Sequence, residues 1–184
     1  FEDINTNPDA TTTVSASLLC TNVILRTTRF GSEAKSYISQ NALPKYIGYA
    51  NEGQMDAQYN RIGSSSFGAM TILPNIEQMV AAAKGGVLED SYKGVAKFAR
   101  AYMFYYLTME MGDIPYSESG LGETGVFKPK YDTQEEVLKG ILDELKEADL
   151  YFANGRTFTG DPTPYAGNPD KWRRATNSFA LKVL

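Results

Sequence analysis

Residues 96–116 read AKFARAYMFYYLTMEMGDIPY, and this stretch decides the fold. It predicts a helix over residues 90–111 that is apolar nearly all the way round. A helix with so little polar surface has to be covered on several sides, so we expect it at the centre of a multi-helix packing. Gly112 and Pro115 mark its exit, because glycine accepts a left-handed turn and proline cannot continue a helix.

Three further helices are expected before this central one. The first follows possible N-cap hydroxyls at Thr11–Thr13, and its apolar residues recur at helical spacing: Val14, Leu18, Leu19, Val23 and Ile24. A shorter helix is expected at residues 32–41. Ser64–Ser66 can cap the third, which runs through Met70, Leu73, Ile76, Met79 and Val80 to Gly85. Pro74 falls inside that run and should kink it or split it.

Two helices are expected after the central one. Asp132 or Thr133 can cap the first, whose apolar stripe consists of Val137, Ile141, Leu145, Ala148 and Phe152, with Lys139, Asp143, Lys146 and Glu147 on the wet face. Asp170 is expected to cap the second, in which Trp172, Ala175, Thr176, Phe179 and Val183 share a face. No stop signal precedes Leu184, so we expect that the sequence has been cut from a longer protein.

The composition is that of a folded, globular protein. The chain has 184 residues, of which 42% are hydrophobic and 22% charged, and its net charge is −4. A chain of this length can bury a real core. Because no run of Lys or Arg occurs, we expect neither nucleic-acid binding nor charge-driven membrane binding. No apolar run reaches the roughly 18 to 20 residues that span a bilayer.

The residue inventory leaves little room for catalysis or for metal binding. The chain contains no histidine, which excludes a Ser-His-Asp triad, a Cys-His pair and His-ligated zinc. Cys20 is the single cysteine and lies among apolar residues, so we interpret it as a buried structural thiol. We therefore expect no cofactor and no metal site.

Two acidic patterns could indicate a metal site or an enzyme instead. Asp3, Asn5, Asn7 and Asp9 alternate as in a calcium loop, but Pro8 occupies the position that needs glycine. Acidic pairs such as Glu77 with Glu110, or Asp143 with Glu144, could be imagined as glycosidase carboxylates. Each of these acids fits a solvated helix face, so no enzyme is expected.

Residues 45–66 have no helical period and form a long predicted loop. Loops of this length are uncommon in compact domains and are often functional. Tyr49 and Tyr59 offer aromatic faces, and Asn60 and Arg61 add planar hydrogen-bond donors. Sugars need that mixture, since an apolar face stacks on the ring and donors bind the hydroxyls. We predict a glycan-binding site at these four residues.

Four stretches together resemble the SusD/RagB family of outer-membrane glycan-binding lipoproteins. They are FEDINTNP at residues 1–8, the segment from Phe98 to Pro115, YDTQEEV with ILDELKEA within residues 131–148, and KWRRATNSFALK at residues 171–182. Their order and separation also resemble the family's. Members exceed twice this length, so residues 1–184 look like the N-terminal portion of one SusD-like domain, truncated at its C-terminal end.

The resemblance implies a mainly α fold, a scaffold of tetratricopeptide-like helix pairs with long loops on the ligand face. It further implies a surface-exposed lipoprotein of the outer membrane that delivers oligosaccharides to a SusC-like TonB-dependent transporter without catalysis. The lipidated N-terminal cysteine of the family is absent, because Cys20 lies inside a predicted helix. Contact with the membrane would therefore need an anchor outside these residues.

Two other functions stay open at this point. A helical-repeat module could bind a protein on its concave face, although no self-similarity at a 34-residue period supports repeats. A glycoside hydrolase stays possible, because its chemistry does not require the missing histidine. It ranks last, because it needs two carboxylates at one cleft and the sequence does not place them there.

Overall fold

The computed structural model describes residues 14–28, 46 and 65–184. Contacts divide the chain into two compact units, one of residues 1–28 with 68–184 and the other of residues 29–67. Of the second unit only Tyr46 and residues 65–67 are described, and Tyr46 is 81% exposed. The predicted helix at residues 32–41 lies outside the described residues, as does most of the predicted loop at residues 45–66.

The described residues form five α-helices and two short 3-10 helices. The α-helices are α1 (Ala16–Thr28), α3 (Leu73–Ala83), α4 (Glu89–Met111), α5 (Gln134–Asn154) and α6 (Pro169–Val183), and the 3-10 helices are η3 (Phe67–Ile72) and η4 (Leu121–Thr124). Strand-like pairing in the described part is limited to one antiparallel bridge between Ile114 and Asp132. The predicted mainly α fold is confirmed.

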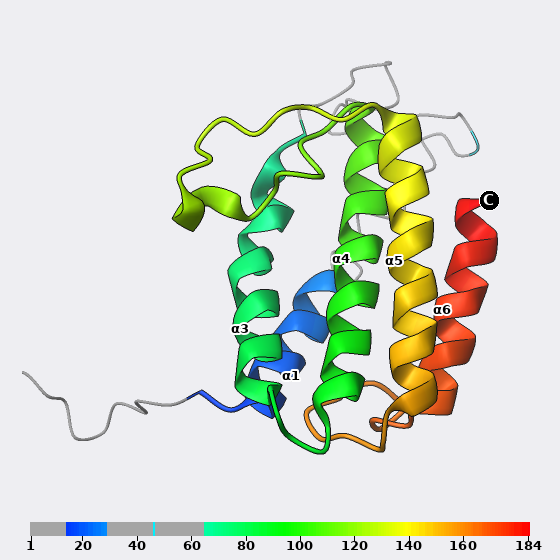
Figure 1. Ribbon diagram of the computed structural model, residues 1–184. Coiled ribbons are helices and arrows are strands. Elements are labelled where there is room, and N and C mark those ends of the chain that lie inside the picture. Colours follow the sequence, from blue (N-terminus) through cyan, green and yellow to red (C-terminus); the bar gives the residue numbers. More distant parts are fainter. Residues whose placement is uncertain (1–13, 29–45, 47–64) are drawn as a thin grey trace, which may run out of the picture. The chain divides into compact units, whose positions relative to one another are not determined.

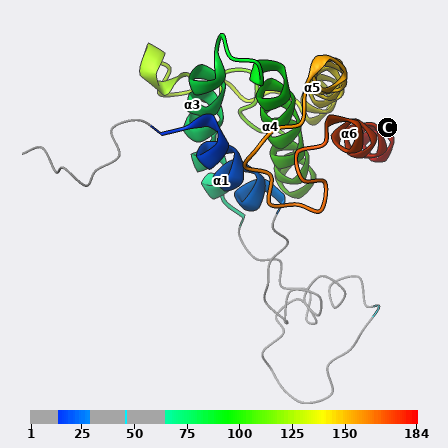
Figure 2. The same cartoon turned by 90° about the horizontal axis from the view of Figure 1, so that it is seen from below.

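Helix α4 is the central element. It contacts α1, α3, α5 and α6, and in Figure 1 the four helices α3, α4, α5 and α6 stand side by side in that order. The view from below shows α1 against α3 and α4 (Figure 2). More than half of the 23 residues of α4 are buried. The predicted enclosed helix is therefore confirmed, and its observed start is one residue earlier.

Local backbone chemistry sets the ends of α3 and α4. Pro74 lies in the first turn of α3, where its missing N–H costs no helical hydrogen bond, and the preceding residues form η3 instead. The predicted split at Pro74 is confirmed. Gly112 ends α4 with φ 78° and ψ −119°. Its φ is positive as expected, but this ψ lies outside the left-handed helical region that the sequence suggested.

Helix α1 corrects two sequence predictions. It begins at Ala16, and the Ser15 hydroxyl accepts a 3.4 Å hydrogen bond from the Leu18 amide, while Thr11–Thr13 lie outside the described residues. Its buried face consists of Leu19, Cys20, Val23 and Ile24. Val14 and Leu18 were predicted to share that face and are 50% and 63% exposed. Only one face of α1 contacts α3 and α4. Leu18 directly precedes the first buried residue, Leu19, and its side chain lies beside this face, not on it.

The caps of α5 and α6 settle the remaining helix starts. Thr133, not Asp132, caps α5, and with Glu136 it forms a reciprocal capping box. Asn168 caps α6 by accepting from the Lys171 amide, so the prediction that Asp170 is the cap was wrong. Pro169 follows the cap directly, which places Asp170 within the first turn. The predicted stripe of α5 is buried throughout, whereas on α6 only Trp172, Thr176 and Phe179 are buried.

Candidate functional site

The predicted glycan-binding residues are not among those that the structure describes. Tyr49, Tyr59, Asn60 and Arg61 all lie within residues 47–64. The described part of the chain offers other candidate features, which are a groove between α3 and α4, a buried polar cluster at the far end of that groove, and the connector of residues 115–131 that leads from α4 to α5.

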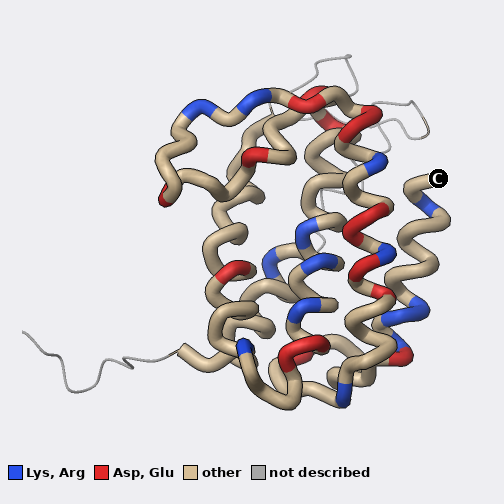
Figure 3. The backbone as a smooth tube through the Cα atoms, viewed as in Figure 1, with Lys and Arg blue, Asp and Glu red and all other residues tan. Residues whose placement is uncertain are grey.

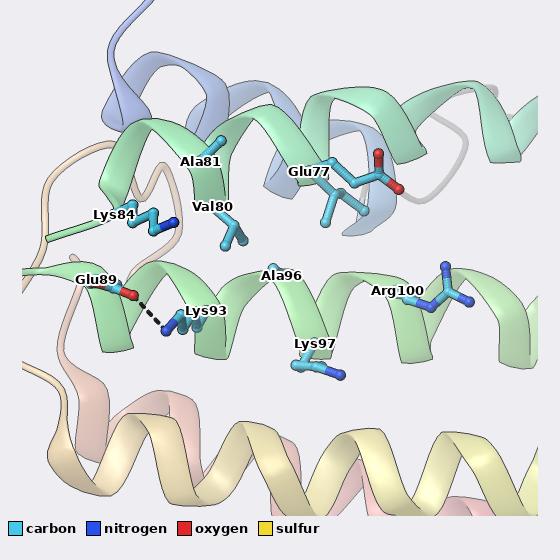
Figure 4. A pocket seen from close by; sticks show the side chains of 10 residues that line it. Glu77, Val80, Ala81, Lys84, Glu89, Lys93, Ala96, Lys97 and Arg100 are labelled. Atoms are coloured by element: carbon cyan, nitrogen blue, oxygen red, sulfur yellow. Dashed lines mark ion pairs between the residues drawn. The ribbon is translucent and has the colours of Figure 1, made fainter. Parts of the chain in front are cut away.

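The groove lies between α3 and α4 and has a volume of about 490 Å³. Figure 4 shows the labelled side chains along both helices. From α3 and its C-terminal end come Ile76, Glu77, Val80, Ala81 and Lys84, and from α4 come Glu89, Lys93, Ala96, Lys97 and Arg100. None of these lining residues is aromatic. The groove therefore lacks the stacking surface that a sugar ring needs, and its chemistry suits an aliphatic group instead.

The cations that α4 presents to the groove are already paired. Lys93 pairs with Glu89, Lys97 lies 2.8 Å from Glu147, and Arg100 lies 2.7 Å from Glu144. Figure 3 shows the same pattern, with basic positions on α4 beside acidic positions on α5. The groove is thus a weak site for an anionic ligand, because binding would compete with existing ion pairs.

Arg100 connects three elements at the end of the groove. Its Nε donates to Glu144 on α5, while Nη2 donates to the Tyr116 carbonyl at 2.9 Å and to the Ser119 hydroxyl at 3.0 Å. The guanidinium also lies over the rings of Phe104 and Tyr116, 4.7 Å and 5.2 Å from their centroids. Arg100 therefore fixes the start of the connector against α4 and α5.

Glu144 is a buried carboxylate, which corrects the expectation that it lies on a solvated helix face. It is 8% exposed. Burial raises its pKa, and the charge of Arg100 opposes that rise. Its Oε2 makes no hydrogen bond with the described residues, although the Tyr116 phenol lies near enough to act on its pKa. Burial and the charge of Glu144 raise the pKa of Tyr116 in turn.

Asp132 holds the two ends of the connector together. Its carboxylate accepts from the Tyr116 amide at 3.2 Å, from the Ser117 amide at 2.6 Å and from the Ser117 hydroxyl at 3.0 Å. Burial alone would raise the pKa of Asp132, but these bonds and Lys130 outweigh it and lower the pKa to about 2. The carboxylate is therefore ionised at neutral pH.

Tyr102, Tyr105 and Tyr106 of α4 pack against α6. The ring centroids of Tyr102 and Tyr105 lie 5.0 Å and 5.3 Å from that of Phe179. Lys182 donates to the Tyr106 hydroxyl at 3.2 Å. Trp172 is 2% exposed and belongs to the core.

The sequence did not predict that Arg100, Glu144 and Asp132 hold the connector against α4 and α5. A signal for Arg100 did exist, because it is the single charged residue among residues 98–107. Nothing local distinguishes Glu144 from its exposed neighbour Asp143. The Arg100–Glu144 pair joins residues 44 positions apart, which no local pattern reveals.

The described part of the chain holds neither a bilayer-spanning helix nor a cluster of metal ligands. No described helix is long and apolar enough to cross a bilayer. No group of three or more His, Cys, Asp or Glu residues is placed there to hold a metal ion. Cys20 is fully buried, as predicted for a structural thiol, and burial together with the charge of Asp161 raises its pKa to about 12.

Comparison with known proteins identifies relatives over nearly the whole chain. Residues 8–184 match a SusD-like family described as starch-binding and associating with the outer membrane. Two solved SusD homologues from Bacteroides fragilis NCTC 9343 are 40% and 37% identical, with TM-scores of 0.84 and 0.74. The alignments cover 92% and 93% of this chain and 35% of each homologue. No curated protein matches the chain.

A third solved structure belongs to a Bacteroides vulgatus ATCC 8482 protein, proposed to be an outer membrane protein involved in nutrient binding. It is 30% identical with a TM-score of 0.73, and the alignment covers 92% of this chain and 35% of that protein. The chain thus spans about a third of the length of the solved relatives it matches. The family match and the identities to the two SusD homologues show that this chain belongs to the SusD-like family.

Proposed function

We propose that the protein binds oligosaccharides or polysaccharide at the cell surface and delivers them to a SusC-like TonB-dependent transporter in the outer membrane. The observation that carries the proposal is the match of residues 8–184 to a family described as starch-binding and associating with the outer membrane. Residues 1–184 would form the N-terminal portion of one SusD-like domain, since the solved relatives are about three times as long. A lipid anchor outside these residues would hold the protein on the membrane.

The ligand would contact the segment around Tyr49, Tyr59, Asn60 and Arg61. Stacking on two phenol rings and hydrogen bonds from an amide and a guanidinium match the chemistry of a pyranose. Single sites of this kind bind weakly, typically with Kd values from micromolar to millimolar. Display beside a transporter raises the local concentration, so weak binding suffices for capture. The protein would hand the glycan over unchanged, without catalysis.

Affinity electrophoresis of the full-length protein tests this proposal. The protein is run on native gels that contain starch or another polysaccharide, and calorimetry then gives the affinity for a retarding glycan. We expect retardation in at least one polysaccharide and its loss in Tyr59→Ala and Arg61→Ala. Tyr131→Ala is the matched control, because Tyr131 is a 62% exposed tyrosine beyond the segment of Tyr49 to Arg61.

Four results would contradict parts of the proposal. Failure to bind any glycan of a broad panel would contradict carbohydrate capture. Binding that survives both substitutions would move the site away from this segment. Release of reducing sugar that disappears on changing one Asp or Glu would establish a glycoside hydrolase instead. Capture of a soluble protein partner in place of a membrane transporter would favour the helical-repeat interaction module.

A further inference from the structure

Tyr116, near the start of the connector, lies in a seat on α5 that exists because residue 140 is glycine. A Cβ atom at Gly140 would collide with Cε1, Cζ and the hydroxyl oxygen of Tyr116. Phe104 of α4 meets the same ring edge-on, with the centroids 5.0 Å apart. Glycine in a helix interior is destabilising relative to alanine. The seat for Tyr116 is therefore a structural reason for Gly140.

The next residues of the connector cross one end of the groove between α3 and α4. The Ser119 hydroxyl accepts from Nη2 of Arg100 at 3.0 Å, and Ser119 is buried. Gly120 lies so close to α3 that a Cβ atom there would stand 2.9 Å from Oε1 of Glu77. Arg100 and Glu77 both line the groove, on opposite helices (Figure 4). Ser119 and Gly120 therefore span the groove at this end.

Beyond these residues the connector is held through its neck. In the described part of the chain, no helix contacts η4, which projects beyond α3 in Figure 1. At the neck, the Ser117 amide donates to Asp132 at 2.6 Å and the Lys130 amide donates to Glu118 at 2.9 Å. Segments with few buried apolar contacts open at lower free energy than the helices around them. The connector has this character, because its attachments are mainly polar.

We propose that residues 116–130 form a movable strap, which closes over Arg100 when Tyr116 is seated at Gly140 and opens as a unit when Tyr116 leaves that seat. In the closed position, Nη2 of Arg100 is occupied by the Tyr116 carbonyl and the Ser119 hydroxyl. Opening frees Nη2 at the end of the groove. Arg100 can then donate to an acceptor group of a ligand in the groove, which the closed strap prevents.

Glu144 supplies a reason for the strap to open. Its Oε2 is buried and makes no hydrogen bond with the described residues. A buried acceptor without a partner costs free energy, and water that enters beneath the open strap can supply the missing hydrogen bond. Arg100 keeps its Nε on Oε1 of Glu144, because that 2.7 Å contact does not involve the connector. The closed strap thus leaves one acceptor unsatisfied, which lowers the free energy needed to open it.

Labelling of Arg100 in the full-length protein tests the strap. Phenylglyoxal modifies accessible guanidinium groups, and mass spectrometry gives the rate at Arg100, with Arg173 as the reference arginine in each sample. Gly140→Ala fills the seat, so we expect Arg100 to be labelled at least about 10-fold faster. Gly122→Ala is the matched control, because a Cβ atom at this glycine of η4 meets nothing within 4 Å.

Two further measurements keep the test independent of changes in α5. Tyr116→Ala empties the seat without altering that helix, and we expect the same rise in Arg100 labelling. Hydrogen exchange follows the amides of Tyr116 and Ser117, which donate to Asp132 in the closed position. We expect these two amides to exchange through one common opening, faster than the buried amides of α4, and faster still in Tyr116→Ala. Circular dichroism confirms the fold of each variant.

The outcomes decide for or against the strap. Faster labelling of Arg100 in both seat variants, with Gly122→Ala unchanged and the amides of α5 still protected, supports it. Unchanged labelling in both variants overturns it, and so does a wild-type connector whose neck amides exchange only as slowly as those of α4. Because the full-length protein is used, polypeptide outside residues 1–184 that pins the connector shut would also leave Arg100 unlabelled and overturn the inference. None of these results bears on glycan binding, so the proposed function is tested separately.

Discussion

The two flanks of α4 are covered to different degrees. Towards α6, rings pack on rings, with centroids 5.2 Å apart for Phe98 and Trp172 and 6.0 Å apart for Phe98 and Phe179. Towards α3, the side chains are small, aliphatic or charged and none is aromatic, among them Ala96 and Lys93 of α4 with Val80 of α3, and a groove of about 490 Å³ remains. Helix α4 is thus largely apolar and yet is not covered equally on every side. The volume of the facing side chains decides which flank closes.

The largest expected effect comes from opening the aromatic flank. Trp172→Ala removes a side chain that packs against Phe98 and Phe152, at centroid distances of 5.2 Å and 5.9 Å. We expect a loss of about 3–5 kcal/mol in the free energy of unfolding, because a large cavity replaces the indole. The variant lacks the single tryptophan of the chain, so its fluorescence cannot report unfolding. Urea denaturation monitored by circular dichroism therefore measures the loss. A loss below about 1 kcal/mol would show that this flank is not the tighter one.

The next effect concerns the buried pair that ties α4 to α5. Arg100→Met leaves the Glu144 carboxylate buried without its cation, and we expect a loss of about 3 kcal/mol at pH 8. Burial already raises the pKa of Glu144, and removing Arg100 raises it further. A group whose pKa is raised by folding stabilises the fold at low pH and loses that contribution as pH rises. The deficit should therefore shrink towards pH 5.

The double variant Arg100→Met with Glu144→Leu provides the control for this prediction. It removes both charges, so it should recover part of the stability that the single variant loses. A deficit of Arg100→Met that is unchanged between pH 8 and pH 5 would contradict an ionised, buried Glu144. In that case the loss would come only from the contacts of Arg100 with the connector.

A pair of matched alanine substitutions compares a fully buried position of α4 with a position beside the groove. Ala101 is fully buried, and Ala96 lines the groove. We expect Ala101→Leu to cost about 1–3 kcal/mol through overpacking. Ala96→Leu can extend into the groove and should change stability by less than about 1 kcal/mol. Both residues are alanines of one helix, so helix propensity cancels in the comparison. Equal losses in thermal or urea denaturation would mean that the groove is closed in solution.

The smallest effect at neutral pH concerns the connector. Hydrogen bonds hold the pKa of Asp132 at about 2, below its ordinary value of 3.8. A group whose pKa is lowered by folding stabilises the fold above the unfolded pKa and loses that contribution as pH falls. Stability should therefore fall between about pH 4 and pH 2, and Asp132→Asn should flatten that part of the profile. Titration by circular dichroism that shows identical slopes would contradict it.

The sequence predicted the helices better than it predicted their polar contacts. The stripe of α5 was identified correctly because Val137, Ile141 and Leu145 repeat at the helical period. The same reasoning placed Leu18 with Leu19 on one face of α1, although only Leu19 is buried. Periodicity predicts the buried face of a helix only to within about one residue. The position of the neighbouring helix decides which of two adjacent apolar residues is buried. The predicted glycan site lies outside the described residues and stays a prediction.

The sequence by itself determined where α3 separates from η3, where α4 ends and where α5 begins. Pro74, Gly112 and the Thr133–Glu136 box act through their own backbone, so their effect is local and readable. Only the tertiary structure decided which charges are buried. Glu144 is buried and Asp143 is exposed because α4 brings Arg100 to one side of α5. Burying a charge is costly without a partner, and that partner comes from a distant part of the chain.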